Sequence, residues 1–136
     1  MSDFSISYKG NLRTEMEHLE SAQKILTDAP KDNQGLGRTF SPTDLVASSL
    51  GSCMLTIIAI AGRTHNLNIL SMNSSVSKIM SNSHPRRIDV INVKIDIRGK
   101  FDEKSKIIIE RSAENCPVHH SLNPNITINL NINYLK

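Results

Sequence analysis

The segment from Ser41 to Arg63 constrains the fold of this chain more than any other part of the sequence. Ser41 is a good N-cap, Pro42 fits the first helical position, and Asp44 is placed to complete a capping box. Apolar residues then recur at helical spacing and also occupy the other faces of the helix. We therefore expect a long helix that ends at Gly62-Arg63 and is buried on most of its sides.

Alternating apolar and polar residues indicate strands on both sides of this helix. They are expected near residues 4–8, 12–19 and 24–27 before it, and near 69–80, 88–98 and 126–134 after it. A second helix is expected over residues 101–115. Asp102 is its N-cap, and it ends near Cys116 because Pro117 disfavours helical geometry at the residue before it. A slip in the alternation at Ile91-Asn92 indicates a β-bulge, and the order of elements is typical of an α+β fold with antiparallel sheet.

The length of 136 residues suits a single domain, residues 1–136, and with 4% aromatics its core must be aliphatic. The formal net charge is +3, and basic residues are scattered among acidic ones, which argues against a nucleic-acid-binding surface. The N-terminus lacks the pattern of a secretory signal. The longest apolar stretch, Met54 to Ala61, is far shorter than the ~20 residues that span a bilayer. We therefore expect a cytoplasmic protein without a nucleic-acid or membrane partner.

The chain has two cysteines, Cys53 within the long helix and Cys116, 63 residues downstream. In a cytoplasmic protein this favours redox or catalytic chemistry over a structural disulfide. A reactive cysteine needs a pKa below its usual value of about 8.5, and the helix dipole is too distant from Cys53 to lower it. Arg38, in the glycine-flanked loop before the helix, is the best source of positive charge. Small residues around Cys53 leave room for a second element or a substrate, and Cys116 is placed to resolve an oxidised Cys53.

Simpler interpretations of the same residues stay open at this point. Free cysteine is among the most buried residue types, so both cysteines could be inert core residues. Cys116, His119 and His120 suggest zinc, but a four-ligand site lacks its usual second cysteine pair. Asp44 alone reads as a helix cap and Arg38 alone as a loop arginine, so spacing by itself does not decide the matter.

Two segments of this chain, FSPTDLVASSLGSCMLTIIAIAGRTHNL and AENCPVHHSL, together resemble the OsmC/Ohr family. The family is named for osmotically inducible protein C and organic hydroperoxide resistance protein. Its signature combines a proline, an acid and a leucine, then Gly-x-Cys within an apolar helix, and a Cys-Pro-Val segment some 60 residues later. The matching positions are Pro42, Asp44, Leu45, Gly51, Cys53, Cys116, Pro117, Val118 and His119.

The resemblance implies a thiol-dependent peroxidase that acts best on organic hydroperoxides, without metal, flavin or other cofactor. Cys53 matches the peroxidatic cysteine, Cys116 the resolving one, and Arg38 matches an arginine of the preceding loop. Asp44 matches an acid common in the wider family. The resemblance also implies an α+β fold with antiparallel sheets and a central buried first helix, in an intertwined homodimer. An external dithiol would reduce the oxidised enzyme.

One position departs from the best-characterised branches of the family, in which a glutamate follows the motif proline and binds the arginine. That position is Thr43 here, and Asp44 is one residue further on. A one-residue shift on a helix rotates a side chain by about 100°. The chain therefore looks like a member of the OsmC-like branch. It also admits a second function: an OsmC-fold protein that binds a lipid-like or sulfur-containing ligand and has little peroxidase activity.

Overall fold

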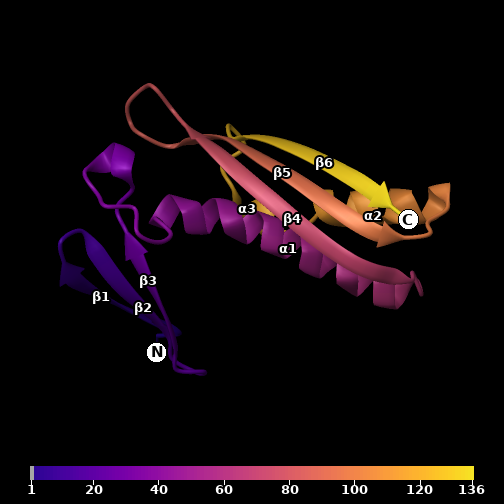
Figure 1. Ribbon diagram of the computed structural model, residues 1–136, viewed down its shortest axis with the longest axis horizontal. Coiled ribbons are helices and arrows are strands. Elements are labelled where there is room, and N and C mark those ends of the chain that lie inside the picture. Colours follow the sequence, from indigo (N-terminus) through magenta and orange to yellow (C-terminus); the bar gives the residue numbers. More distant parts are fainter. Residues whose placement is uncertain (1) are drawn as a thin grey trace. The chain divides into compact units, whose positions relative to one another are not determined.

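The computed structural model of the chain describes residues 2–136 (Figure 1). Within that range the elements are β1 (Phe4–Gly10), β2 (Arg13–His18), β3 (Gln23–Asp28), η1 (Lys31–Asn33), α1 (Pro42–Thr64), β4 (Ile69–Met80), β5 (Ile88–Gly99), α2 (Glu103–Glu114), α3 (Pro117–Ser121) and β6 (Thr127–Leu135). The chain divides into two compact units, the first ending at Val46 and the second beginning at Ala47. The single domain expected from the chain length stays a prediction.

The first unit contains the antiparallel sheet β1-β2-β3. A short turn at Asn11 and Leu12 joins β1 to β2. Gly10, Asn11 and Leu12 have φ of 84°, 55° and 62°, in the left-handed region that favours glycine and asparagine. Where β2 pairs with β3, Arg13 lies directly opposite Asp28. This register sets a basic residue against an acidic one at the end of β3.

The loop after β3 folds back on the strand that precedes it. At Gly35 a Cβ atom would lie 1.7 Å from the Ala29 carbonyl oxygen, so only glycine fits there. Gly37 has φ of 59° and donates a backbone hydrogen bond to the same Ala29 oxygen at 3.2 Å. The two glycines therefore give the segment before α1 a defined conformation.

A reciprocal capping box begins α1, as the sequence predicts. The Ser41 hydroxyl accepts a hydrogen bond from the Asp44 backbone N–H at 3.1 Å, and the Asp44 carboxylate accepts one from the Ser41 N–H at 2.9 Å. The helix runs over Pro42–Thr64, so it ends within two residues of the predicted end.

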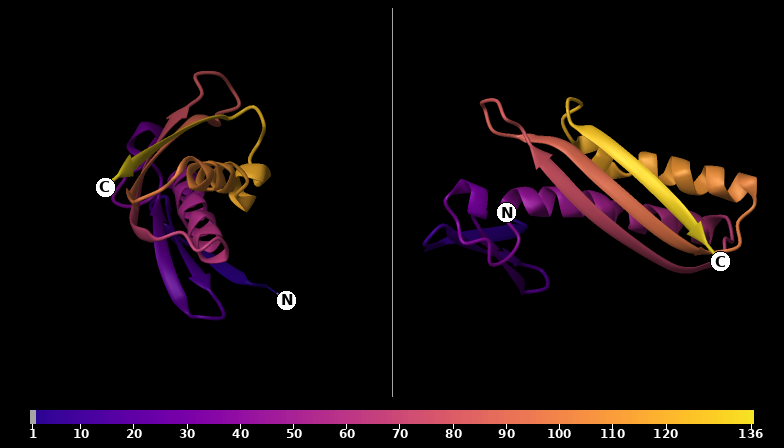
Figure 2. Two further views of the ribbon diagram at one scale, coloured as in Figure 1. Left: turned by 90° about the vertical axis from the view of Figure 1, so that its right-hand side faces the viewer. Right: turned by 45° about the horizontal axis from the view of Figure 1, so that its top comes forward.

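The second unit contains the sheet β4-β5-β6, and its topology corrects one expectation. β4 and β5 are antiparallel, but β5 and β6 are parallel, with Val90 opposite Thr127 and Arg98 opposite Leu135. The expectation of antiparallel pairing is wrong for β6 because α2 and α3 carry the chain back to the end of the sheet where β5 begins (Figure 2).

The predicted bulge exists but lies earlier in β5 than Ile91-Asn92. Ile79 pairs with Val90 and Met80 pairs with Ile88, so Asp89 is the extra residue. The bulge switches the buried side of the strand from even to odd residue numbers.

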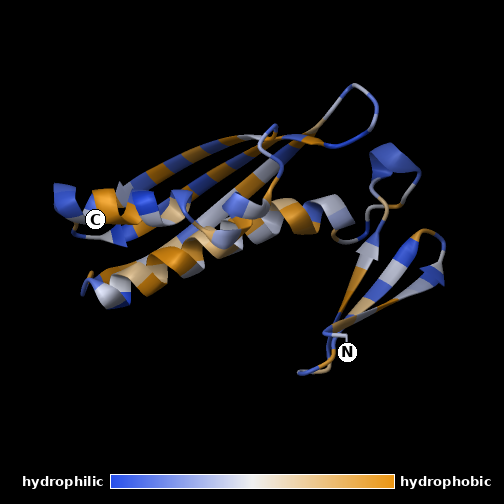
Figure 3. Cartoon of the chain, turned by 180° about the vertical axis from the view of Figure 1, so that it is seen from behind, coloured by the Kyte–Doolittle hydropathy of each residue, from blue (hydrophilic) through white to orange (hydrophobic). Residues whose placement is uncertain are grey.

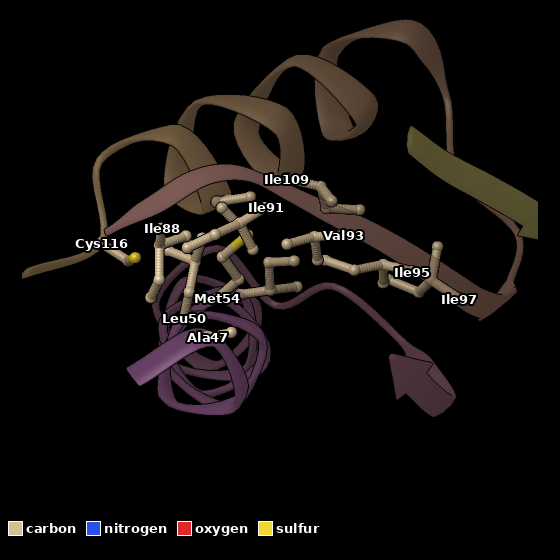
Figure 4. Close-up of a cluster of buried hydrophobic side chains, with 12 residues drawn as sticks. Ala47, Leu50, Met54, Ile88, Ile91, Val93, Ile95, Ile97, Ile109 and Cys116 are labelled. Atoms are coloured by element: carbon tan, nitrogen blue, oxygen red, sulfur yellow. The ribbon is translucent and has the colours of Figure 1, made fainter. Parts of the chain in front are cut away.

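The aliphatic core of the second unit lies between this sheet and its two longer helices, α1 and α2 (Figures 2 and 4). Apolar and polar residues alternate along β5 (Figure 3), and the apolar residues Ile91, Val93, Ile95 and Ile97 are buried. The fully or almost fully buried members are Ala47, Leu50, Met54 and Ile58 of α1, Ile88, Ile91, Val93, Ile95 and Ile97 of β5, Ile109 and Ala113 of α2, and Cys116. The expected α+β class and aliphatic core are confirmed.

Within residues 2–136, α1 buries one stripe of its surface. Leu50, Met54 and Ile58 follow each other at four-residue spacing and are each 0% exposed. Thr56 and Ile60 lie on another face of the same helix and are exposed. The expectation of burial on most sides is therefore not met by one copy of the chain.

By length and composition alone, α1 is long and apolar enough to qualify as a membrane-spanning helix. Its apolar residues include Leu50, Met54 and Ile58, which belong to the core. A core helix passes the same test as a membrane span, so this property is weak support for a membrane location.

Candidate active site

The structure brings the two cysteines together within the second unit. Cys53 lies on α1 and is partly buried, whereas Cys116 lies between α2 and α3 with 0% of its surface exposed. Both are free thiols. Cys116 points toward the core cluster (Figure 4), against which Cys53 also packs, and Cys53 lies close enough to raise the pKa of Cys116. Two residues from distant parts of the sequence thus form one dithiol site.

Cys116 caps a short helix that the sequence analysis missed. Its Sγ accepts a hydrogen bond from the His119 backbone N–H at 3.3 Å, at the N-terminus of α3. Burial raises the pKa of the Cys116 thiol, the His119 N–H lowers it, and the neighbouring Cys53 raises it again. The net shift is upward, so Cys116 is a protonated thiol at neutral pH. The available signal for α3 was Pro117, a residue suited to the first position of a helix.

Gly51 explains part of the run of small residues near Cys53. A Cβ atom at Gly51 would lie 2.7 Å from Cγ2 of Val76 and 3.1 Å from Oγ of Ser74, both on β4. The glycine of the Gly-x-Cys motif therefore lets α1 approach the sheet closely. This confirms the prediction that small residues make room for a second element. Within residues 2–136 the buried Ser74 hydroxyl has no hydrogen-bond partner.

Arg38 belongs to an ion cluster in the first unit that the sequence analysis did not find. Its Nε and Nη2 donate to the Asp28 carboxylate at 3.0 and 3.3 Å, and its backbone N–H donates at 2.9 Å. Arg13 binds the same carboxylate through Nε and Nη2, at 2.9 and 3.3 Å. These hydrogen bonds, first from Arg13 and then from Arg38, hold the pKa of Asp28 well below its usual range. The action of Arg38 on Cys53 stays a prediction.

Asp28 could have been found from the β2-β3 register, which sets Arg13 against it across the hairpin. The periodicity of these strands is weak, and an isolated acid at a strand end reads as solvent-exposed. In the structure only 1% of its surface is exposed.

Thr43 and Asp44 take part in the helix cap. The Thr43 hydroxyl is hydrogen-bonded to that of Ser41 at 3.2 Å, and the Asp44 carboxylate accepts from the Ser41 N–H. The capping role of Asp44 is confirmed, and its catalytic role stays a prediction.

The histidines after Cys116 stack on each other, with ring centroids 5.9 Å apart. His120 is hydrogen-bonded to the Asn115 side chain at 3.1 Å, and the Nδ1 atom of His119 is buried. Within residues 2–136 no group of three or more His, Cys, Asp or Glu side chains is arranged to hold a metal ion. The zinc interpretation of this segment therefore gains no support.

Comparison with known proteins gives the same family as the sequence motifs. The family described as OsmC-like protein matches residues 34–131. Among curated proteins the sequence has no significant match.

Solved structures include a protein of Psychrobacter arcticus 273-4, provisionally named an osmotic stress induced and detoxification response protein. It shares 42% identity over 97% of this chain and 96% of its own, with a TM-score of 0.91. An OsmC-like protein of Mycoplasma pneumoniae shares 19% identity over 100% and 98% of the two chains, with a TM-score of 0.83. The organic hydroperoxide resistance protein OsmC of Legionella pneumophila shares 13% identity over 98% of each chain, with a TM-score of 0.78.

The two more distant structures support the fold alone. The family match covers both cysteines, Arg38 and the helix cap, and the Psychrobacter protein matches along nearly the whole chain. This chain therefore belongs to the OsmC-like protein family.

Proposed function

We propose that this protein is a cysteine-based peroxidase that reduces organic hydroperoxides, and hydrogen peroxide more slowly, in defence against oxidative stress. The observation that carries the proposal is the dithiol site: a partly buried Cys53 beside a fully buried Cys116, whose pKa burial and Cys53 both raise. Family membership supports it, since several relatives are named organic hydroperoxide resistance proteins. The protein acts in the cytoplasm, without nucleic-acid or membrane partners.

The reaction proceeds in three balanced steps. The Cys53 thiolate attacks one peroxide oxygen of ROOH, the O–O bond breaks, and the leaving alkoxide takes a proton to become an alcohol. The resulting sulfenic acid on Cys53 condenses with the Cys116 thiol, which forms the disulfide and releases water. An external dithiol then returns both cysteines to thiols by exchange and is itself oxidised.

The difference between the two thiols supports this division of roles. Attack on peroxide needs a thiolate that the substrate can reach, and Cys53 is the more accessible of the two. Burial keeps Cys116 protonated and shielded, so it reacts only with the sulfur beside it. Arg38, from the same chain or a second copy, stabilises the Cys53 thiolate. Asp44 contributes to the site by capping the start of α1, the helix that carries Cys53.

The protein acts as a homodimer. Phe4, Ile6 and Tyr8 lie on one side of β1 and are 58%, 60% and 66% exposed, and Ile60 of α1 is 53% exposed. Burying such side chains stabilises by about 1.5–3 kcal/mol each. A second copy of the chain that covers these residues supplies the burial of α1 that a single copy lacks.

The second candidate function is ligand binding with little peroxidase activity, and Thr43 favours it, because the glutamate that binds the arginine in other branches is absent there. Thiol titration distinguishes the two functions. One equivalent of cumene hydroperoxide per chain should reduce the titratable thiols from two to none, and dithiothreitol should restore them. Thiols that survive the peroxide would exclude the peroxidase and leave the binding function.

A further inference from the structure

Asp28 is a buried carboxylate that two arginines, Arg13 and Arg38, surround and bind. Only 1% of its surface is exposed, and a buried carboxylate is costly unless it is paired and hydrogen-bonded. Five hydrogen bonds from Arg13 and Arg38 meet that need, and two guanidinium groups more than neutralise its charge. Asp28 therefore stays ionised over the whole physiological pH range.

The same hydrogen bonds restrain Arg38 at three of its atoms: the backbone nitrogen, Nε and Nη2. The Arg38 side chain is 48% exposed, and an exposed arginine without such a partner samples many rotamers. A bidentate ion pair fixes both the position and the plane of the guanidinium. The loop takes part as well, because the Asp28 N–H donates to the Phe40 carbonyl at 3.1 Å.

We propose that Asp28 is the positioning residue for Arg38, and that this acid at the end of β3 replaces the acid that binds the arginine from the first turn of the helix in other branches of the family. The inference rests on the proposed function, in which Arg38 stabilises the Cys53 thiolate. At the usual position this chain has Thr43, whose hydroxyl is hydrogen-bonded to Ser41. In this chain the acid that binds the arginine is therefore Asp28 at the end of β3, and not a residue in the first turn of α1.

A double-mutant cycle tests the proposal with the full-length chain. Asp28→Asn should lower the second-order rate constant for cumene hydroperoxide by about tenfold to a hundredfold, as expected when a charged group moves by ~1 Å. In the Arg38→Ala background the same change should cause no further loss, because Asp28 acts only through Arg38. Asp32→Asn, which removes an exposed acid of the neighbouring 3₁₀ helix, is the matched control and should keep the wild-type rate.

Two results would overturn the proposal: a wild-type rate in Asp28→Asn, or losses in the double variant that simply add. If Asp28→Asn does not fold, Asp28→Glu is the second variant, since it keeps the buried charge and displaces the guanidinium. A lowered rate in Asp28→Glu that vanishes in the Arg38→Ala background supports the proposal, and a wild-type rate contradicts it.

A measurement without peroxide separates this inference from the proposed function. In ¹⁵N NMR spectra, the Arg38 Nε–H should give a slowly exchanging signal in the wild type and lose it in Asp28→Asn. If the wild type reduces no peroxide, the proposed function fails. The Arg38 Nε–H signal then tests the positioning role of Asp28 without the reaction. Loss of the signal in Asp28→Asn supports this role, and persistence of the signal in Asp28→Asn contradicts it.

Discussion

At Cys116, burial and the start of α3 act on the thiol in opposite directions. Removal from water disfavours the thiolate and raises the pKa, while the His119 N–H favours the thiolate. Burial outweighs the hydrogen bond, so the thiol is held in its unreactive form until an oxidised sulfur lies beside it. In the proposed reaction, this unreactive form would protect Cys116 from peroxide until Cys53 is oxidised.

Exchanging each cysteine for serine should produce different failures. Cys53→Ser should abolish peroxide reduction, because the remaining thiol is buried and protonated. Cys116→Ser should consume one peroxide per chain and then over-oxidise at Cys53, because no thiol is left to condense with the sulfenic acid. Peroxide consumption and the mass of the Cys53 peptide report both outcomes. Equal activity of the two variants would contradict the assignment.

The raised pKa of Cys116 can be measured in the Cys53→Ser variant. There the influence of the Cys53 thiol is gone and burial remains, so the Cys116 thiol should titrate above the usual cysteine value of about 8.5. Because the pKa of Cys116 is raised in the folded state, its protonated thiol contributes fully to stability below the pKa of the unfolded chain. That contribution is lost as the pH rises through the folded pKa, so the free energy of unfolding should fall over this range. Thiolate absorbance against pH gives the titration. A midpoint at or below 8.5 would show that the α3 hydrogen bond outweighs burial.

At the level of elements, the contact between α1 and β4 depends on Gly51. Ala has the better helix propensity by about 1 kcal/mol, but its Cβ would lie 2.7 Å from the stiff Val76 side chain. Overpacking of this kind costs about 1–3 kcal/mol, so the clash should outweigh the gain.

Gly51→Ala should therefore lower the free energy of unfolding by about 1 kcal/mol in denaturant titrations. Val76→Ala removes the methyl group that the new Cβ meets. In that background Gly51→Ala should be neutral or stabilising, through helix propensity alone. If Gly51→Ala stabilises the otherwise wild-type protein, the contact between α1 and β4 has space for a Cβ atom and the predicted clash with Val76 is wrong.

Element boundaries could be predicted well because capping and alternation are local. The Ser41–Asp44 box and the Asp102 cap both form as expected. The direction of β6 could not be predicted, because apolar and polar residues alternate in the same way in parallel and antiparallel strands. For the site, the dithiol pair followed from two motifs, whereas Asp28 depends on a strand register and a loop that bring Arg13 and Arg38 to one carboxylate.

For the whole molecule, the exposed apolar residues of β1 and α1 are the main argument for a second copy. α1 buries one stripe on its own sheet and leaves Ile60 exposed. A two-fold axis repeats each contact, so one self-complementary surface suffices to cover both copies.

Light scattering during size exclusion should report twice the chain mass of 15.1 kDa at micromolar concentration. Ile60→Glu, which places a charge on the exposed face of α1, should shift the protein toward monomer. Ile107→Glu, at an exposed apolar position on α2, is the matched control. A wild-type monomer with full peroxidase activity would refute the dimer and any need for it at the site.

Single-turnover kinetics test the central claim of a Cys53 peroxidase most directly. Stopped-flow mixing of the reduced protein with one equivalent of cumene hydroperoxide or hydrogen peroxide gives the two second-order rate constants. The account predicts faster reaction with the organic peroxide, one peroxide consumed per chain, and no consumption by Cys53→Ser. Peroxide consumption that persists in Cys53→Ser, or none in the wild type, would contradict it.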